Sequence, residues 1–158
     1  MPSTFAIASD HAGFELKEAL KREFEKRGAT IQDFGTTALE SCDYPDFAHA
    51  VSRAVANGSA QLAILVCGTG VGMSIAANRN PSVRAVVCSE PLSARMARQH
   101  NDANVLCLGA RVVGVGTAID IVDAFFTSHF EGGRHAARVA KINAGLEAQG
   151  TFAAGSEA

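Results

Sequence analysis

The feature that most constrains the fold is an apolar run followed by a glycine-rich loop. Residues 62–66 read Leu-Ala-Ile-Leu-Val, and the loop is Cys67-Gly68-Thr69-Gly70-Val71-Gly72. The run does not alternate apolar and polar residues, which is typical of a strand covered on both faces. Residues 71–78 then have helical spacing. This order predicts a buried parallel strand that ends at Cys67, a tight turn and a helix.

The same alternation of strand and helix patterns runs along most of the chain. It predicts strands at residues 5–9, 30–34, 62–67, 84–89 and 105–109, and helices at 14–27, 45–57, 71–78, 91–99, 115–128 and 136–148. We therefore expect an α/β fold, a three-layer αβα sandwich around a Rossmann-like, doubly wound, five-stranded parallel sheet. Residues 1–149 should form one domain, and residues 150–158 should be a flexible tail.

Composition argues against several classes of partner. The formal net charge of −2 over 158 residues gives no general attraction for nucleic acid or for an anionic membrane surface. No apolar stretch approaches the roughly 20 residues that cross a bilayer. The chain shows no secretory signal, and its four cysteines form no CxxC pair. We expect a cytoplasmic protein without nucleic-acid or membrane partners.

Polar and reactive residues follow four of the five predicted strands. They are Asp10-His11, the Cys67–Gly72 loop, Ser89-Glu90 and Gly109-Ala110-Arg111. In a doubly wound sheet, ligands bind beyond the carboxyl ends of the strands. We therefore expect these four segments to line one edge of the sheet.

The Cys67 loop has two interpretations. Its successive backbone N–H groups beside a helix N-terminus form an anion site, and the same field favours a thiolate on Cys67. Such a loop suits chemistry in which negative charge develops on a substrate oxygen. The simpler interpretation is a tight turn with a small apolar side chain. The loop lacks the Gly-Lys-Ser/Thr of a P-loop, and Met73 stands where the dinucleotide-binding pattern G-x-G-x-x-G requires glycine. Glu90 lies about 20 residues further on, where a ribose-binding acid is expected, so a nucleotide site remains an alternative.

The other polar candidates also have structural alternatives. Asp10 is either a helix N-cap or, with His11, a ligand for sugar hydroxyls. His100 either complements a helix C-terminus or acts as an acid and base. Tyr44 is either a wall of the site or a loop anchor.

Two arginines share one face of the last predicted helix. Arg134 and Arg138 are four residues apart, and Arg111 follows the last strand. They are either exposed surface charges or ligands for a phosphate dianion. No cluster has metal-ligand spacing, so we expect no metal.

Six motifs, in order along the chain, resemble the ribose/galactose sugar-phosphate isomerases typified by type B ribose-5-phosphate isomerase. They are Ser9-Asp10-His11-Ala12-Gly13-Phe14, Asp43-Tyr44-Pro45, the Cys67–Gly72 loop, Arg84-Ala85-Val86-Val87, Arg98-Gln99-His100-Asn101-Asp102 and Glu131-Gly132-Gly133-Arg134-His135. The resemblance covers residues 5–146. The chain resembles the cysteine branch of the family, because it has Cys67 and no carboxylate in the following helix turn, whereas another branch has serine and uses a nearby glutamate as base.

This resemblance implies a cofactor-independent aldose–ketose isomerase of the pentose phosphate pathway. The enzyme would interconvert D-ribose 5-phosphate and D-ribulose 5-phosphate through an enediolate. Cys67 would move the proton, Thr69 would assist, and His100 with Asp10 would open the sugar ring. The alternatives are an isomerase of hexose 6-phosphates or tetrose 4-phosphates, or a phosphosugar- or nucleotide-binding protein without catalysis.

The resemblance also implies a set of substrate ligands and an assembly. Substrate would contact Asp10, His11, Tyr44, Gly68, Thr69, Gly70, Val71, Gly72, Asn101, Arg111, Arg134 and Arg138. Among these residues, His11 and the three arginines would hold the phosphate. The final helix, about residues 134–148, would pack on a partner subunit. A homodimer, or a tetramer of such dimers, would then share its active sites between subunits.

Overall fold

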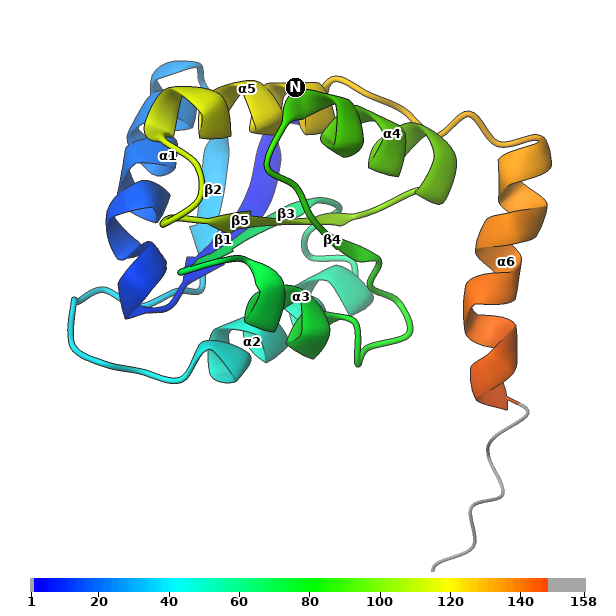
Figure 1. Ribbon diagram of the computed structural model, residues 1–158, viewed down its shortest axis with the longest axis horizontal. Helices are drawn as coiled ribbons and strands as arrows, with labels where there is room; N and C mark the ends of the chain where they lie inside the picture. The colour runs from blue at the N-terminus through cyan, green and yellow to red at the C-terminus, as the bar shows by residue number, and fades with distance from the viewer. Residues whose placement is uncertain (1, 148–158) are drawn as a thin grey trace, which may run out of the picture.

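The computed structural model describes residues 2–147, and within this range a sheet lies between two layers of helices (Figure 1). The strands are β1 (Thr4–Ser9), β2 (Thr30–Asp33), β3 (Ala63–Cys67), β4 (Ala85–Val87) and β5 (Val105–Gly109). The helices are α1 (Phe14–Lys26), α2 (Tyr44–Ala56), α3 (Val71–Ala77), α4 (Pro91–Asn101), α5 (Val115–Phe126) and α6 (Arg134–Glu147), with a 3-10 turn at His11–Gly13.

The five strands form one parallel sheet in the order β2-β1-β3-β5-β4. In β3 and β5 every residue is buried, as the unbroken apolar runs predicted. The predicted α/β class and the Rossmann-like, five-stranded parallel sheet are confirmed. None of the described helices is long and apolar enough to cross a membrane.

Each face of the sheet has its own core. On one face α1, α4 and α5 cover a cluster rich in large side chains, where Phe5, Phe24 and Phe126 pack edge-to-face or tilted against one another. On the other face α2 and α3 cover a cluster of mostly small side chains that includes Cys67 and Met73. The smaller residues let α2 and α3 pack closely on the sheet and on each other.

Most elements differ from the sequence expectation by one or two residues at an end. β4 is shorter than predicted, because an edge strand pairs with β5 alone. α4 extends through Asn101, where Asp102 adopts the left-handed conformation that ends it. α6 begins at Arg134, the start expected for the final helix from the family resemblance, and stands beside α4 at the side of the domain (Figure 1). The predicted tail, residues 150–158, lies outside the described residues.

A buried lysine connects α1 to β2. The side chain of Lys17 is fully buried, and its ammonium lies 2.6 Å from Asp33 Oδ2 and 2.9 Å from Glu18 Oε1. Burial alone would raise the pKa of Asp33, but hydrogen bonds from Lys17 and Lys21 outweigh burial and lower it. A carboxylate with a lowered pKa stabilises the folded state above its unfolded pKa, and this contribution is lost as the pH falls.

Asp33→Asn should therefore lower the free energy of unfolding at neutral pH by about 1–3 kcal/mol, because it removes the carboxylate that pairs with buried Lys17. The difference from the parent should shrink as the pH falls below about 4, where the unfolded carboxyl becomes protonated. Urea unfolding at pH 7 and pH 3 measures both values. Asp120→Asn, on the exposed surface of α5, is the control. An equal loss at both pH values would contradict the prediction.

Candidate active site

The segments that follow β1, β3, β4 and β5 lie at one edge of the sheet. Asp10 donates its backbone N–H to the carbonyl of Val66 at the end of β3, with N and O 3.3 Å apart. Cys67 lies opposite Gly109 in the register of β3 and β5. The backbone N–H of Cys88, just after β4, donates to Cys107 in β5. The expectation of a common edge is confirmed.

The Cys67 side chain turns back into its own loop. Its Sγ accepts a hydrogen bond from the backbone N–H of Gly70, with N and S 3.1 Å apart. Gly70 has φ +80°, and a Cβ there would lie 3.1 Å from a backbone carbon of Leu108. A backbone N–H donor stabilises an anionic sulfur more than a neutral one. The loop therefore holds the Cys67 sulfur within reach of one of its own backbone N–H groups.

Two neighbouring side chains lie against the glycines of this loop. A Cβ on Gly72 would lie 2.8 Å from the ring of Tyr44, so only glycine lets this ring approach the start of α3. A Cβ on Gly68 would lie 3.6 Å from the side chain of Arg111, whose backbone N–H donates to the Gly68 carbonyl. Tyr44 and Arg111 thus flank the loop.

Thr69 is exposed at the tip of the loop. Its hydroxyl accepts a hydrogen bond from the backbone N–H of Val71 across 3.4 Å. Its backbone packs so closely on Gly109 that a Cβ there would lie 2.8 Å away. The side chain therefore projects from a backbone that is held against β5.

Asp10 and His11 complete this group. Asp10 is buried, and its Oδ1 accepts the backbone N–H of Gly13 at 3.0 Å, so the N-cap interpretation is confirmed. The Nδ1 of His11 accepts the backbone N–H of Cys42 at 3.2 Å. An imidazole that accepts at Nδ1 carries its proton on Nε2, which can then donate to a ligand. No sequence pattern indicated the contribution of Cys42, because it comes from the backbone of a distant loop.

The remaining predicted site residues lie at the opposite edge. α4 runs antiparallel to the strands, so His100 and Asn101 at its end lie near Val105, where β5 begins. Cys67 pairs with the other end of β5, four residues away, or about 13 Å along the strand. The chain brings together Asp10, His11, Tyr44, Cys67, Gly68, Thr69, Gly70, Val71, Gly72 and Arg111, and it separates them from His100, Asn101, Arg134 and Arg138.

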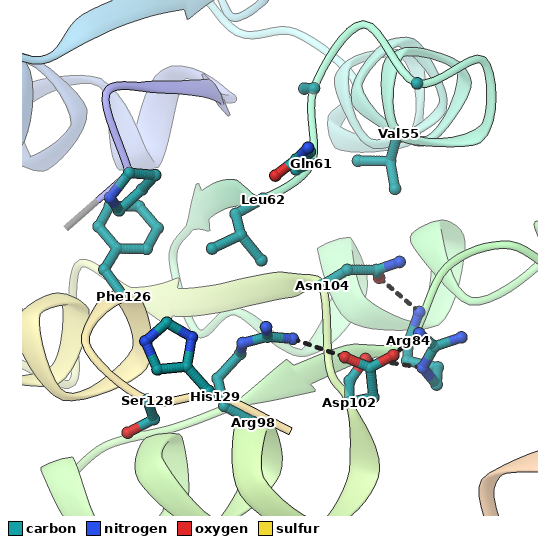
Figure 2. A pocket seen from close by; sticks show the side chains of 13 residues that line it. Val55, Gln61, Leu62, Arg84, Arg98, Asp102, Asn104, Phe126, Ser128 and His129 are labelled. Carbon is teal, nitrogen blue, oxygen red and sulfur yellow. Dashed lines mark hydrogen bonds and ion pairs between the residues drawn. The ribbon is translucent and has the colours of Figure 1, made fainter. Parts of the chain in front are cut away.

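An ion-pair network holds the turn after His100 (Figure 2). Asp102 pairs with Arg84 at 2.8 Å and with Arg98 at 3.0 Å, and Arg84 also donates to the Asp102 carbonyl at 2.7 Å. These side chains line a cavity of about 470 Å³ that contains no residue of the Cys67 loop. We interpret the network as structural support for the end of α4.

His100 has two close neighbours that the sequence did not pair with it. Its ring stacks on that of His135 at the start of α6, with centroids 4.2 Å apart. Glu131 Oε2 lies 3.9 Å from His100 Nε2 and 3.7 Å from His135 Nε2. Burial, followed by repulsion from His100, lowers the pKa of His135. The motif Glu131-Gly132-Gly133-Arg134-His135 was visible in the sequence, but its contact with His100 depends on how α6 packs.

Comparison with protein families and curated proteins gives matches over most of the chain. The profile of the ribose/galactose isomerase family matches residues 5–142. The chain is 52% identical to ribose-5-phosphate isomerase B of Escherichia coli over 139 residues, which cover 88% of this chain and 93% of that protein.

Solved structures are also similar over most of the chain. Ribose-5-phosphate isomerase B of Clostridium thermocellum superposes with a TM-score of 0.90 at 50% identity, covering 92% of this chain and 98% of that one. The Mycoplasma genitalium enzyme, solved with bound ribulose-5-phosphate, has a TM-score of 0.86 at 41% identity and covers 91% and 96%. The similarity thus extends from sequence to three-dimensional structure.

The packing of the loop predicts that Gly70→Ala will lower the thermal unfolding midpoint by several degrees. A side chain at φ +80° is strained, and its Cβ would press on the backbone of β5. Gly116→Ala is the matched control, since a Cβ at Gly116 in α5 meets no atom within 4 Å. Thermal unfolding followed by circular dichroism compares the two. If both variants melt with the parent, the loop is not held as described.

Proposed function

The chain belongs to the ribose/galactose isomerase family and is an isomerase, and we propose that it interconverts D-ribose 5-phosphate and D-ribulose 5-phosphate with Cys67 as the base. The observation that carries this assignment is the position of the thiol within a loop of backbone donors, where the Gly70 N–H reaches Sγ at 3.1 Å. The relatives named ribose-5-phosphate isomerase B support the choice of substrate.

The proposed reaction is a proton transfer between two adjacent carbons. The Cys67 thiolate takes the proton from C2 of the open-chain aldose, and the electron pair of the C–H bond forms the enediolate, with negative charge on O1. The thiol then returns the proton to C1 while the hydroxyl proton moves from O2 to O1, which leaves the ketose. Loop N–H groups and the Thr69 hydroxyl stabilise the oxyanion, and a single such donor contributes about 2.7–4 kcal/mol. The scheme uses no metal or organic cofactor.

Ring opening requires a second acid and base, and we assign it to His100 and Asp10. The hemiacetal hydroxyl loses a proton and the ring oxygen gains one. Within one chain these two residues lie at opposite edges of the sheet, so one copy cannot supply both to the same sugar. We propose that His100 and Asn101 act in the site of a second copy.

The proposed phosphate ligands also lie in two separate places within one chain. His11 and Arg111 lie with Cys67, whereas Arg134 and Arg138 are exposed on α6. We propose a homodimer, alone or paired into a tetramer, in which α6 of one subunit carries its arginines to the phosphate in the other. Guanidinium groups suit this role because they bind phosphate oxygens with paired N–H donors.

We also propose that the enzyme works in the cytoplasm. All four cysteines are free thiols: Cys42, Cys67, Cys88 and Cys107. A catalytic thiol without a disulfide partner suits a reducing compartment.

Cys67→Ala should lower kcat by about 10²-fold or more, because it removes the base, and phosphosugar affinity should be retained. Incorporation of solvent deuterium at C2 of ribose 5-phosphate measures the proton transfer directly, and it should disappear in the variant. Cys88→Ala is the control, since burial raises the pKa of this thiol to about 11 and keeps it protonated at neutral pH. Deuterium exchange that persists in Cys67→Ala would exclude Cys67 as the base.

Shared sites predict complementation between two variants, one without turnover and one with weakened substrate binding. Arg138→Glu should raise KM strongly by repelling the phosphate, and Cys67→Ala should have no turnover. Co-expression should restore about a quarter of the parent activity, because half of randomly formed dimers are mixed and each has one intact site. Activity that stays at the level of the separate variants would indicate a site built within one subunit.

A further inference from the structure

Three side chains of metal-binding type converge where α4 meets α6. His100 ends α4, Glu131 lies in the connection from α5 to α6, and His135 lies in the first turn of α6. One ligand atom from each lies within 4.8 Å of the others. The backbone N–H of Glu131 donates to the Gln99 carbonyl at 3.0 Å, which holds the connection against α4.

The donor set and its spacing suit a small divalent cation. Two imidazoles and a carboxylate are the protein ligands of many zinc sites that keep a fourth position open. Zinc binds these atoms at about 2.0–2.2 Å, so ligand atoms lie about 3.5 Å apart around the ion. The distances of 3.7 and 3.9 Å from Glu131 to the two histidines are slightly longer. The imidazole planes are 5° apart, so binding must turn the rings until their lone pairs converge.

Charges of both signs lie around the cluster. Arg134 and Arg138 are on the same helix as His135, and the Glu131 carboxylate lies within 3.9 Å of both imidazoles. Glu131 is half-exposed and supplies the negative charge. The positive charges of Arg134 and Arg138 repel a divalent cation, so the affinity for zinc should be lower than at a structural zinc site.

We propose that His100, Glu131 and His135 form a binding site for a divalent transition-metal ion of the zinc class, and that the bound ion inhibits ring opening. The ion would occupy the lone pair that His100 needs to accept a proton. This second part rests on the proposed function of His100. Ribulose 5-phosphate has its C5 oxygen esterified and cannot close a furanose ring, so its conversion should be less sensitive than that of ribose 5-phosphate.

Metal binding is tested without catalysis. Titration calorimetry with ZnCl2 uses Cys67→Ala as the parent, because the thiolate of Cys67 would also bind zinc. Adding Glu131→Gln or His135→Asn should weaken binding about tenfold or more. His49→Asn, an exposed histidine on α2, is the control and should leave the affinity unchanged. Equal affinity in the parent and in Glu131→Gln would overturn the site, and Glu131 is exposed enough that its replacement should not unfold the chain.

Inhibition is tested with Cys67 present. Initial rates are measured with ZnCl2 in both directions, for the natural chain and for Glu131→Gln. The proposal expects stronger inhibition with ribose 5-phosphate, and a rise in the half-inhibitory zinc concentration in Glu131→Gln. Equal inhibition in both directions, unrelieved by the variant, would assign the effect to Cys67 and overturn the inhibitory role. If the proposed function itself were wrong, the natural chain would instead show no turnover even in the absence of zinc.

Discussion

The hydrogen-bonded pairing of β3 with β5 is the interaction on which the site depends. It continues past the strand ends, where Ala110 donates to the Cys67 carbonyl and Arg111 donates to the Gly68 carbonyl. Backbone hydrogen bonds alone therefore hold both loops in place. Because the thiol, the loop donors and Arg111 extend from this paired backbone, their relative positions follow from the register of two fully buried strands. Rigid strands position such groups more accurately than free loops do.

The direction of α4 has the opposite consequence. A helix that connects two parallel strands must return to the edge where the strands begin, so His100 is carried away from Cys67. The Arg84–Asp102–Arg98 network then holds the end of the helix at that edge (Figure 2). A reaction that uses both residues requires two copies of the chain. The same displacement brings His100 to Glu131 and His135, so the residue proposed for ring opening is also part of the proposed metal site.

Much of the fold and one half of the candidate site could be predicted from local pattern. Strands β3 and β5 were recognised because two-sided burial leaves continuous apolar runs, and the rule that ligands bind beyond strand ends then grouped Asp10 with the Cys67 loop. The short length of β4 was missed, because an edge position depends on strand order, which local pattern does not contain. The contacts of Cys42 with His11 and of Glu131 with His100 were missed because each joins segments far apart in the chain.

The amino-acid sequence alone was enough to predict the class of fold, the loop that holds the Cys67 thiol and the chemistry that this loop suits. Hydrophobic periodicity and glycine conformation depend on only a few neighbouring residues, so they can be read locally. Packing in three dimensions was needed to assign each group to an edge of the sheet. It placed Tyr44 against Gly72, stacked His100 on His135, and separated both histidines from Cys67. The reason is that strand register and helix direction are set by burial across the whole domain, and no short stretch of sequence carries that information.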